Sequence, residues 1–285
     1  VTTTDDDTAG FTIAETSSST TVAETGSTDT FTVVLNSEPT GNVVFALTDN
    51  DTDNTEISYS PTALTFTSGN WNSAQTVTVT GVDDTVDDGD ISSGITIAIN
   101  TGSTADSIYD TVSSQTVAVT NTDDDTAGFT IAETSGTSVS EAGSTDTFTV
   151  VLNSQPTGNV VFNVTSGDTG EATDSSSTLT FTTGDWNSAQ TMTVTGINDD
   201  IEDGNVNSTT TIAINTGSTA DSDYDSVSSQ TVTVTTTDDD TAGFTIVQSS
   251  GSTAVAETGS TDTFTVVLNT QPTGNVVFAL TDNDT

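Results

Sequence analysis

The sequence of 285 residues contains no lysine, arginine, histidine or cysteine. Without Lys or Arg the chain has no cations for phosphate groups, which excludes nucleic-acid binding and polybasic contact with an anionic membrane. Without His or Cys it cannot build a Ser-His-Asp or Cys-His nucleophile, a zinc site of the usual kinds or a disulfide. Acid–base chemistry would depend on carboxylates and three tyrosines, and we expect the protein not to be an enzyme.

What the chain has instead is 42 acidic residues and a formal net charge of -42. No basic side chain offsets this charge. Hydrophobic residues make up 31% of the chain, and low hydrophobicity with high net charge is typical of disordered proteins. The apolar runs are too short to span a membrane. The composition therefore indicates that folding requires a further source of stability.

Internal repeats divide the chain. The string DDDTAGFTI begins at Asp5, Asp123 and Asp238, at intervals of 118 and 115 residues. These intervals are too long for the coil of a solenoid and match a complete small domain. We predict the end of a preceding repeat and a linker at 1–7, repeat 1 at 8–125, repeat 2 at 126–240, and the first three strands of an incomplete repeat at 241–285.

The two ends of the sequence overlap in nearly identical residues, 1–52 and 234–285. We expect such a sequence to be a window on a longer array. Three strands of a sandwich would leave inner faces uncovered and strand edges unpaired. Residues 241–285 are therefore expected to fold only when further strands are supplied.

Within each repeat, apolar and polar residues alternate with a period of two, as at Phe31, Val33 and Leu35. Threonine and other β-branched residues are abundant, and they favour strands. In repeat 1 we expect strands at 10–23 (interrupted), 29–36, 42–48, 62–67, 75–82, 94–100 and 115–121. About seven short antiparallel strands per repeat predict an all-β fold of tandem immunoglobulin-like β-sandwiches.

Acidic residues concentrate after the first, third, fifth and seventh of these strands. Because consecutive strands alternate in direction, these four strand ends are expected at one pole of the sandwich. Two carboxylates about 4 Å apart repel by about 4 kcal/mol at an effective dielectric of about 20. Ca²⁺ takes about six to eight oxygen ligands and accepts irregular geometry. The sequence therefore predicts calcium at this pole; the alternative is a solvated acidic surface.

These residues resemble those of Calx-beta domains, which occur in sodium–calcium exchangers and in very large bacterial surface proteins. The resemblance is carried by a glutamate after the first strand (VAETG and VSEAG), by the run G-[VI]-[DN]-D-x-x-[DE]-D-G after the fifth strand, and by the linker DDDTAGF. It covers both complete repeats and the visible third of another. In the family, calcium lies at the pole that faces the next domain.

The resemblance implies two sets of calcium ligands. In repeat 1 they are Glu24, Asp51, Asp83, Asp84, Asp87, Asp123, Asp124 and Asp125. In repeat 2 they are Glu141, Asp168, Asp199, Asp200, Glu202, Asp238, Asp239 and Asp240. Asn198 stands where repeat 1 has Asp83, so the two sets are expected to differ in the number of ions that they hold.

The sequence as a whole predicts an extracellular or cell-surface, bacterial, calcium-rigidified structural protein that acts as a stalk, extender or filament. Its partners would be neighbouring repeats of the same chain or other copies of it. One alternative is an adhesin that binds glycan or protein through its loops, which a unique aromatic-rich loop would favour. The other is a calcium sensor, which would need a membrane or effector domain.

Overall fold

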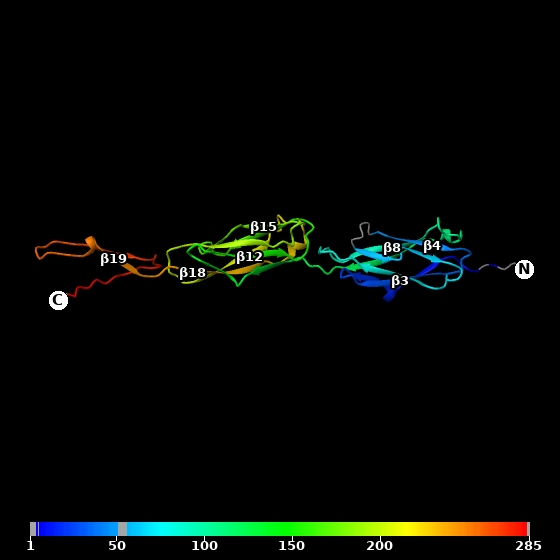
Figure 1. Ribbon diagram of the computed structural model, residues 1–285, viewed down its shortest axis with the longest axis horizontal. Coiled ribbons are helices and arrows are strands. Elements are labelled where there is room, and N and C mark those ends of the chain that lie inside the picture. Colours follow the sequence, from blue (N-terminus) through cyan, green and yellow to red (C-terminus); the bar gives the residue numbers. More distant parts are fainter. Residues whose placement is uncertain (1–3, 5, 51–55, 284–285) are drawn as a thin grey trace. The chain divides into compact units, whose positions relative to one another are not determined.

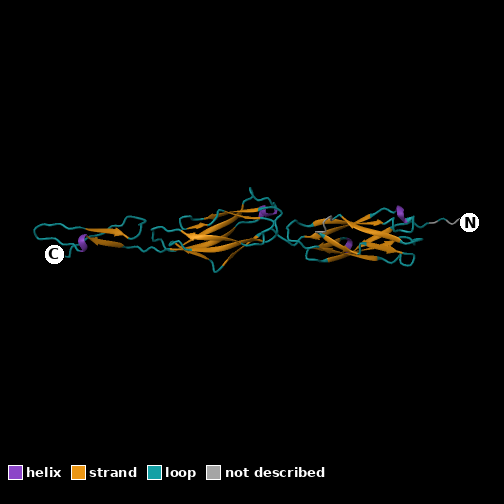
Figure 2. Ribbon diagram, turned by 45° about the horizontal axis from the view of Figure 1, so that its top comes forward, coloured by secondary structure: helices purple, strands orange, loops and turns teal. Residues whose placement is uncertain are grey.

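The computed structural model describes residue 4, residues 6–50 and residues 56–283. The chain forms two units, Val1–Ala127 and Gly128–Thr285. Strands and loops make up almost all of both, as Figure 2 shows. The helices in the described residues are single 3-10 turns: η1 Thr16–Ser18, η2 Tyr109–Thr111, η3 Asp223–Ser226 and η4 Ser249–Gly251. None of these turns is long or apolar enough to cross a membrane.

In the first unit, repeat 1 forms two packed sheets (Figure 1). The strands are β1 Phe11–Glu15, β2 Thr20–Ala23, β3 Thr28–Leu35, β4 Val43–Asp49, β5 Ile57–Ser60, β6 Ala63–Phe66, β7 Gln75–Gly81, β8 Ile91–Ile99 and β9 Gln115–Thr122. One sheet has the order β1-β3-β7-β5 and the other the order β2-β9-β8-β4-β6. Together they make a β-sandwich.

In the second unit, repeat 2 forms an equivalent pair of sheets, in the orders β10-β12-β16-β14 and β11-β18-β17-β13-β15. The strands are β10 Phe129–Glu133, β11 Thr137–Ser140, β12 Thr145–Leu152, β13 Val160–Ser166, β14 Ala172–Asp174, β15 Thr178–Phe181, β16 Gln190–Gly196, β17 Val206–Ile214 and β18 Gln230–Thr237. The predicted all-β sandwich fold is therefore confirmed in both repeats.

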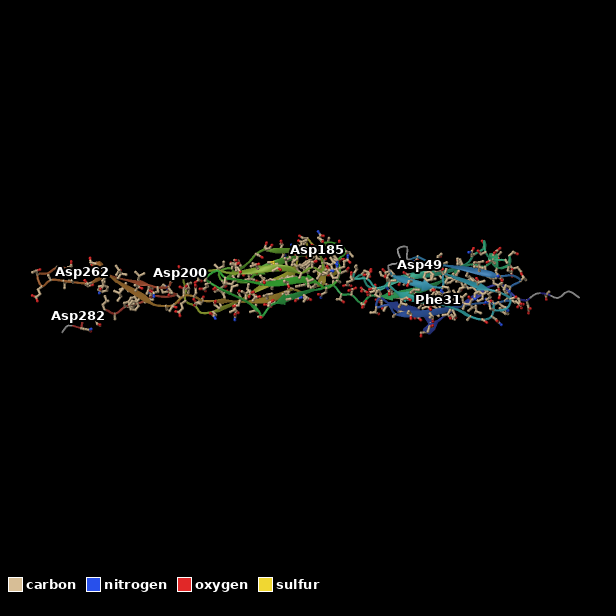
Figure 3. The ribbon with its side chains drawn as sticks, in the orientation of Figure 1. Phe31, Asp49, Asp185, Asp200, Asp262 and Asp282 are labelled. Carbon is tan, nitrogen blue, oxygen red and sulfur yellow. The ribbon has the colours of Figure 1, made fainter. Side chains whose placement is uncertain are left out.

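The alternating residues of each strand place one apolar face between the two sheets. Phe31 and Val33 of β3 and Phe45 of β4 are fully buried, and Phe31 is labelled in Figure 3. Phe45 packs edge-to-face against Phe11 and Phe66, with ring centroids 4.8 and 5.9 Å apart. The apolar half of the alternating pattern thus supplies the core.

The first expected strand, 10–23, is two strands in different sheets. β1 pairs antiparallel with β3, whereas β2 pairs parallel with β9 in the other sheet. The crossing occurs at η1, where Ser17 and Ser18 have positive φ angles of 59° and 70°. The expectation of antiparallel strands throughout is therefore wrong for this pair and for its counterpart, β11 and β18.

Strand β5 was missed by the sequence pattern. It is four residues long, pairs antiparallel with β7, and has a single buried side chain, that of Ile57. So short a run, with one buried residue, gives almost no alternation from which a strand could be predicted. Its counterpart β14 is shorter still, at three residues.

Residues 241–283 of the second unit contain strands β19 Phe244–Gln248 and β20 Phe264–Leu268, which pair antiparallel. Phe244 and Phe278 pack edge-to-face with centroids 4.8 Å apart, like Phe11 and Phe45 in repeat 1. Residues 276–282 match β4 in sequence but do not form a strand. Several apolar side chains here remain exposed, including Val277 and Leu280.

The loop between β8 and β9 holds a buried carboxylate, Asp106, which is 3% exposed. Asp106 accepts hydrogen bonds from the backbone N–H of Thr40 at 2.7 Å, the Thr40 hydroxyl at 3.0 Å and the backbone N–H of Ile108 at 2.9 Å. Burial raises the pKa of Asp106, but these hydrogen bonds outweigh burial and lower it overall. The carboxylate therefore ties the β3–β4 loop to the β8–β9 loop.

Substituting this carboxylate tests whether it is structural. Asp106→Ala should lower the free energy of unfolding of repeat 1 by about 1–3 kcal/mol, because the hydrogen bonds from Thr40 and Ile108 to a charged acceptor are lost. Thermal unfolding at several calcium concentrations measures the effect, with Asp110→Ala at an exposed position as the matched control. The calcium concentration that gives half-maximal stabilisation should stay the same in both variants; a shift in Asp106→Ala alone would show that this residue is part of a calcium site.

Candidate metal centres

The directions of the strands bring several chain segments to one pole of repeat 1. β2 is parallel to β9, and both β4 and β9 are antiparallel to β8. The C-terminal ends of β2, β4 and β9 therefore lie at the same pole. Glu24 follows β2, Asp49 (labelled in Figure 3) ends β4, and Asp123 follows β9.

Strand β7 reaches this pole from the other sheet, and a glycine permits its approach. A Cβ at Gly81, the last residue of β7, would lie 2.1 Å from the carbonyl oxygen of Ala23. Any other residue would push β7 away from the end of β2. Gly196 meets Ser140 in the same way, also at 2.1 Å. The acidic loop after β7 is thereby held beside Glu24.

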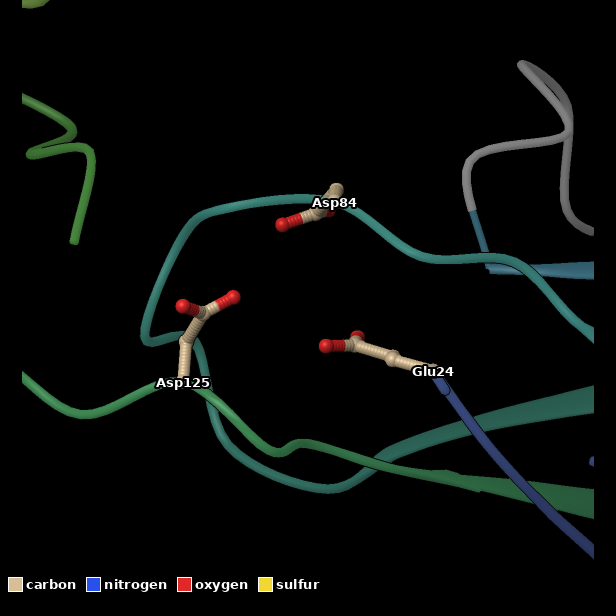
Figure 4. Close-up of side chains that lie close together, drawn as sticks. All are labelled: Glu24, Asp84 and Asp125. Atoms are coloured by element: carbon tan, nitrogen blue, oxygen red, sulfur yellow. The ribbon is translucent and has the colours of Figure 1, made fainter. Parts of the chain in front are cut away.

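Carboxylates from three segments meet at this pole. One oxygen from each of Glu24, Asp84 and Asp125 lies within 4.8 Å of the others, and Figure 4 shows the three side chains directed toward one another. Glu56, Asp84 and Asp88 form a second group, in which one oxygen from each residue again lies within 4.8 Å of the others. We call these five residues cluster 1. Asp84 belongs to both groups, so the two candidate sites are adjacent.

Cluster 1 contains buried oxygen atoms that lack a hydrogen-bond partner among the described residues. Glu24 is 1% exposed, and its Oε2 has no partner. Asn121 is equally buried; its amide nitrogen donates to Glu24 Oε1 at 3.4 Å and to Glu56 Oε2 at 3.5 Å, while its own Oδ1 has no partner. A buried oxygen without a donor is destabilising. An oxygen-rich, negatively charged donor set of this kind fits a hard cation.

The electrostatics of the cluster point the same way. Burial, followed by the charges of Asp84 and Asp123, raises the pKa of Glu24 to about 7. Burial and the neighbouring aspartates also raise the pKa of Asp125. A raised pKa means that the ionised carboxylate is disfavoured where it stands. A bound cation would reverse this effect by favouring the ionised form.

The raised pKa of Glu24 predicts how the calcium-free protein responds to pH. The folded state binds this proton more tightly than the unfolded state, whose ordinary value is 4.5. The stabilisation is therefore fully present below about pH 4.5 and is lost as the pH rises through about 7. After calcium is removed by dialysis, the melting temperature should be several degrees higher near pH 5 than near pH 8.

Glu24→Gln provides the control for this pH response, because it removes the group that titrates. In calcium-free buffer, the melting temperature of the variant should differ less between about pH 5 and about pH 8 than that of the unsubstituted chain. A melting temperature that stays constant or rises from about pH 5 to about pH 8 in the unsubstituted chain would contradict the assignment.

Repeat 2 builds an equivalent arrangement. Glu141, Asp238 and Asp240 form one group with oxygens within 4.8 Å of one another, and Glu141, Glu171 and Asp203 form a second. We call these five residues cluster 2. Glu141 and Glu171 are 2% and 7% exposed, and one oxygen of each has no partner among the described residues. Burial, followed by neighbouring carboxylates, raises the pKa of both.

The two clusters differ at one buried position. Thr236 of β18 pairs in register with Val206, just as Asn121 of β9 pairs with Ile91. Thr236 donates its hydroxyl to the carbonyl oxygen of Glu171 at 3.4 Å, and it offers no amide to the carboxylates. The shared carboxylate also differs, since it is Asp84 in cluster 1 and Glu141 in cluster 2.

The structure groups six of the residues that the resemblance implies as ligands: Glu24, Asp84, Asp125, Glu141, Asp238 and Asp240. Asp51 lies outside the described residues. The other residues implied by the resemblance do not belong to these groups: Asp83, Asp87, Asp123, Asp124, Asp168, Asp199, Asp200, Glu202 and Asp239. Their role as ligands stays a prediction.

Several of these residues instead shape the surrounding loops. Asp123 accepts a hydrogen bond from the backbone N–H of Gly89 at 2.7 Å, and Asp87 accepts one from Ala127 at 2.7 Å. In repeat 2, Glu202 accepts a hydrogen bond from the N–H of Ala242 at 3.2 Å. These contacts hold the loop after β7 or β16 against the chain that follows β9 or β18.

Four carboxylates of the clusters were not among the predicted ligands: Glu56, Asp88, Glu171 and Asp203. Glu56 and Glu171 directly precede β5 and β14. Because the sequence did not predict these two strands, it gave no reason to place either glutamate at the acidic pole. Asp88 and Asp203 stand in the acidic runs after β7 and β16, where the sequence did not separate one aspartate from the next. In the structure, the backbone of Glu56 fixes its position beside β7, because its carbonyl oxygen accepts a hydrogen bond from the N–H of Val82 at 2.9 Å. The sequence pattern carries no sign of this contact.

No family model and no curated protein sequence matches the chain. Its structural neighbours include tandem calcium-binding and S-layer domains. CBD12 from CALX1.2 is 18% identical, with a TM-score of 0.30 over 70% of this chain and 79% of that one. Calcium binding domain CBD12 of CALX1.1 is 17% identical, with a TM-score of 0.29 over 68% and 76%. The S-layer protein SbsC domains 4 and 5 are 18% identical, with a TM-score of 0.32 over 81% and 99%. The candidate metal centres of this chain are defined by its own carboxylates.

Proposed function

We propose that the protein is an extracellular structural repeat protein whose joints are stiffened by calcium. The observation that carries this proposal is the unpartnered, buried carboxylate oxygen of Glu24 and its counterpart in Glu141, each inside a group of carboxylates. The chain has no basic residue that could neutralise them. A divalent cation supplies both the charge and the coordination that these oxygens lack.

The donor set favours calcium over other metals. It consists of carboxylate oxygens with a nearby amide oxygen, that of Asn121, and contains no nitrogen or sulfur donor. Zinc and copper sites normally use His or Cys. Mg²⁺ requires a regular octahedron and keeps several of its waters, whereas Ca²⁺ accepts a larger and less regular set of oxygens. Two groups that share one carboxylate would hold a pair of calcium ions in each cluster.

A ligand in the linker connects calcium binding to stiffness. Asp125 lies between the end of β9 at Thr122 and the start of β10 at Phe129. The same linker is tied to the pole by the hydrogen bond from Ala127 to Asp87. Binding of Asp125 to calcium would fix the linker at a second point and remove backbone freedom there. Asp240 occupies the equivalent position after β18.

Extracellular calcium modules bind the ion with dissociation constants of about 10⁻⁴–10⁻³ M, so a fold that depends on calcium suits the outside of a cell. We therefore place the protein outside the cell or at the cell surface, as a stalk, extender or filament whose partners are neighbouring repeats or other copies. Coordination at a linker supports a mechanical role and supplies no nucleophile. On this proposal the protein is not an enzyme.

Small-angle scattering tests the mechanical role. The maximum dimension should increase when millimolar calcium is added, and it should not change to the same extent with magnesium. Asp125→Asn should lose most of the increase, while Asp110→Asn, which removes the same charge at an exposed position, should keep it. Calcium that raises the melting temperature without changing the scattering profile would contradict stiffening and leave calcium binding supported.

A further inference from the structure

Residues 241–283 correspond in sequence to residues 8–50 of repeat 1, but only part of them forms the strands found there. β19 and β20 are equivalent to β1 and β3, and they pair in the same antiparallel register. Residues 253–256 match β2 and residues 276–281 match the first six residues of β4, yet neither segment is a strand. One pair of segments thus keeps its ladder and the other does not.

The two segments that form no strand are those whose partners in repeat 1 come from a hairpin further along the chain. In repeat 1, β8 pairs with β4, β9 pairs with β2, and β8 and β9 pair with each other. The hairpin therefore lies between β2 and β4, in the sheet order β2-β9-β8-β4-β6. Residues 241–283 contain no counterpart of this hairpin. Strands equivalent to β2 and β4 need it as their common neighbour.

Side chains that this hairpin covers in repeat 1 are exposed in residues 241–283. Phe45 of β4 is fully buried, whereas its counterpart Phe278 is 42% exposed. Val22 of β2 is also buried, whereas its counterpart Val255 is 68% exposed. Large apolar side chains exposed together mark a surface that binds another protein segment.

A cavity of about 530 Å³ opens beside these apolar side chains. Phe244 and Phe278 line its apolar part. Its polar part consists of residues that follow β20, whose counterparts in repeat 1 lie in the β3–β4 loop. These are Thr270, Thr273 and Gly274, which match Ser37, Thr40 and Gly41.

In repeat 1 the turn of the β8–β9 hairpin occupies the corresponding place. The hydroxyl of Tyr109, which is buried, donates to the carbonyl oxygen of Ser37 at 2.7 Å. The carboxylate of Asp106 accepts from the N–H of Thr40 at 2.7 Å. A buried aromatic ring and two hydrogen bonds to loop backbone therefore seat this turn.

Repeat 2 seats its own turn in the same way. Tyr224 donates to the carbonyl oxygen of Ser154 at 2.6 Å, and Asp221 accepts from the N–H of Thr157 at 2.7 Å. Both turns have the sequence Ala-Asp-Ser-x-Tyr-Asp, beginning at Ala105 and Ala220. The pattern of tyrosine and aspartate that fits the loop is thus the same in the two complete sandwiches.

A glycine in each loop shows whether the place is filled. A Cβ at Gly41 would lie 3.0 Å from the Cβ of Ala105, and a Cβ at Gly158 would lie 2.9 Å from that of Ala220. At Gly274, no atom of the described residues lies within 4 Å of such a Cβ. The third loop therefore has the shape that receives the turn, with nothing against it.

We propose that residues 241–283 bind a β-hairpin that carries the sequence Ala-Asp-Ser-x-Tyr-Asp at its turn and belongs to another molecule. The hairpin would pair with residues 253–256 on one side and residues 276–281 on the other, which is strand addition to a sheet. Its tyrosine would enter the cavity and donate to the carbonyl oxygen of Thr270, and its aspartate would accept from the N–H of Thr273. Binding would join two molecules through one shared sandwich.

The test is a titration of the full, isotope-labelled chain with a synthetic peptide of residues 91–122, followed by amide chemical shifts. We expect saturable shifts confined to residues 241–283, with slowed hydrogen exchange at the two segments that gain a partner. Tyr109→Ala in the peptide should weaken the affinity by about tenfold or more, because a buried ring and its hydrogen bond are lost. Ile108→Ala, at a position that is 61% exposed in repeat 1, is the matched control and should bind like the unsubstituted peptide.

A substitution in the chain tests the cavity itself. Gly274→Val should leave the free chain folded, because space surrounds this position, and should weaken peptide binding by about tenfold or more through a clash with the alanine of the turn. Thr265→Val, at an exposed position in β20, is its control and should leave the affinity unchanged.

Four results would overturn the proposal. They are the absence of saturable shifts, shifts in repeat 1 in place of residues 241–283, equal affinities of the Tyr109→Ala and Ile108→Ala peptides, and sedimentation in which the chain dimerises and excludes the peptide. The last result would show that a second copy covers this surface. Peptide binding does not depend on whether clusters 1 and 2 bind calcium.

Discussion

Removing calcium is expected to lower the melting temperature of the chain by about 10 °C or more. A ligand that binds only the folded state adds about 2.7 kcal/mol when its concentration is about a hundred times its dissociation constant. A stabilisation of about 1 kcal/mol shifts the midpoint of a domain of this size by several degrees. With two candidate sites in each repeat, the sum is a large part of a domain's usual stability.

Differential scanning calorimetry before and after chelation measures this loss. Sodium chloride should restore only part of the melting temperature, because screening weakens repulsion between carboxylates without coordinating them. Magnesium should restore less than calcium does. Identical melting curves in calcium and in chelator would show that the clusters are solvated acidic surfaces.

The second large effect is expected from Glu24→Gln, and its sign should depend on calcium. With calcium bound, the variant loses a buried charged ligand, and its calcium affinity should fall by about tenfold or more. Without calcium, the variant removes a buried carboxylate whose ionised form is disfavoured, as its pKa of about 7 shows. Its melting temperature in chelator should then exceed that of the unsubstituted chain by ~5 °C.

Thermal unfolding of both proteins, with and without calcium, gives the comparison. The matched control is Glu38→Gln, at an exposed position in the β3–β4 loop. It should change neither the melting temperature in calcium nor the melting temperature in chelator. A variant that is destabilised equally in calcium and in chelator would show that Glu24 has only a structural role. Glu141→Gln provides the same test in repeat 2.

The alternation of apolar residues was enough to predict the sandwich and most of its strands, because buried strands repeat with a period of two. Phe31, Val33 and Leu35 alternate over a full strand and are all buried. Ile57 stands almost alone in its strand, so β5 left no comparable pattern. The parallel pairing of β2 with β9 depends on the crossing of the chain from one sheet to the other at Ser17 and Ser18, whose positive φ angles are not favoured by residue type.

The sequence was enough to predict at which pole of the sandwich the candidate site lies, but not which carboxylates form it. The positions of Glu24 and Asp125 follow from strand ends, and both lie in cluster 1. Which aspartate of the loop after β7 points inward depends on the path of that loop and on its hydrogen bonds, such as that from Val86 to Asp84 at 2.7 Å. Asn121 is a strand residue whose side chain lies against Gly81, where a Cβ would come within 2.7 Å of its Oδ1, so the contact of Asn121 with the carboxylates depends on a glycine in another strand.

The most direct test of the central claim is an anomalous difference map from crystals grown in millimolar calcium. The account predicts peaks bounded by the carboxylates of Glu24, Asp84 and Asp125 in repeat 1, and by those of Glu141, Asp238 and Asp240 in repeat 2. Soaking the crystals in chelator should remove these peaks. Crystals in millimolar calcium with no anomalous density at either group of carboxylates would contradict the account.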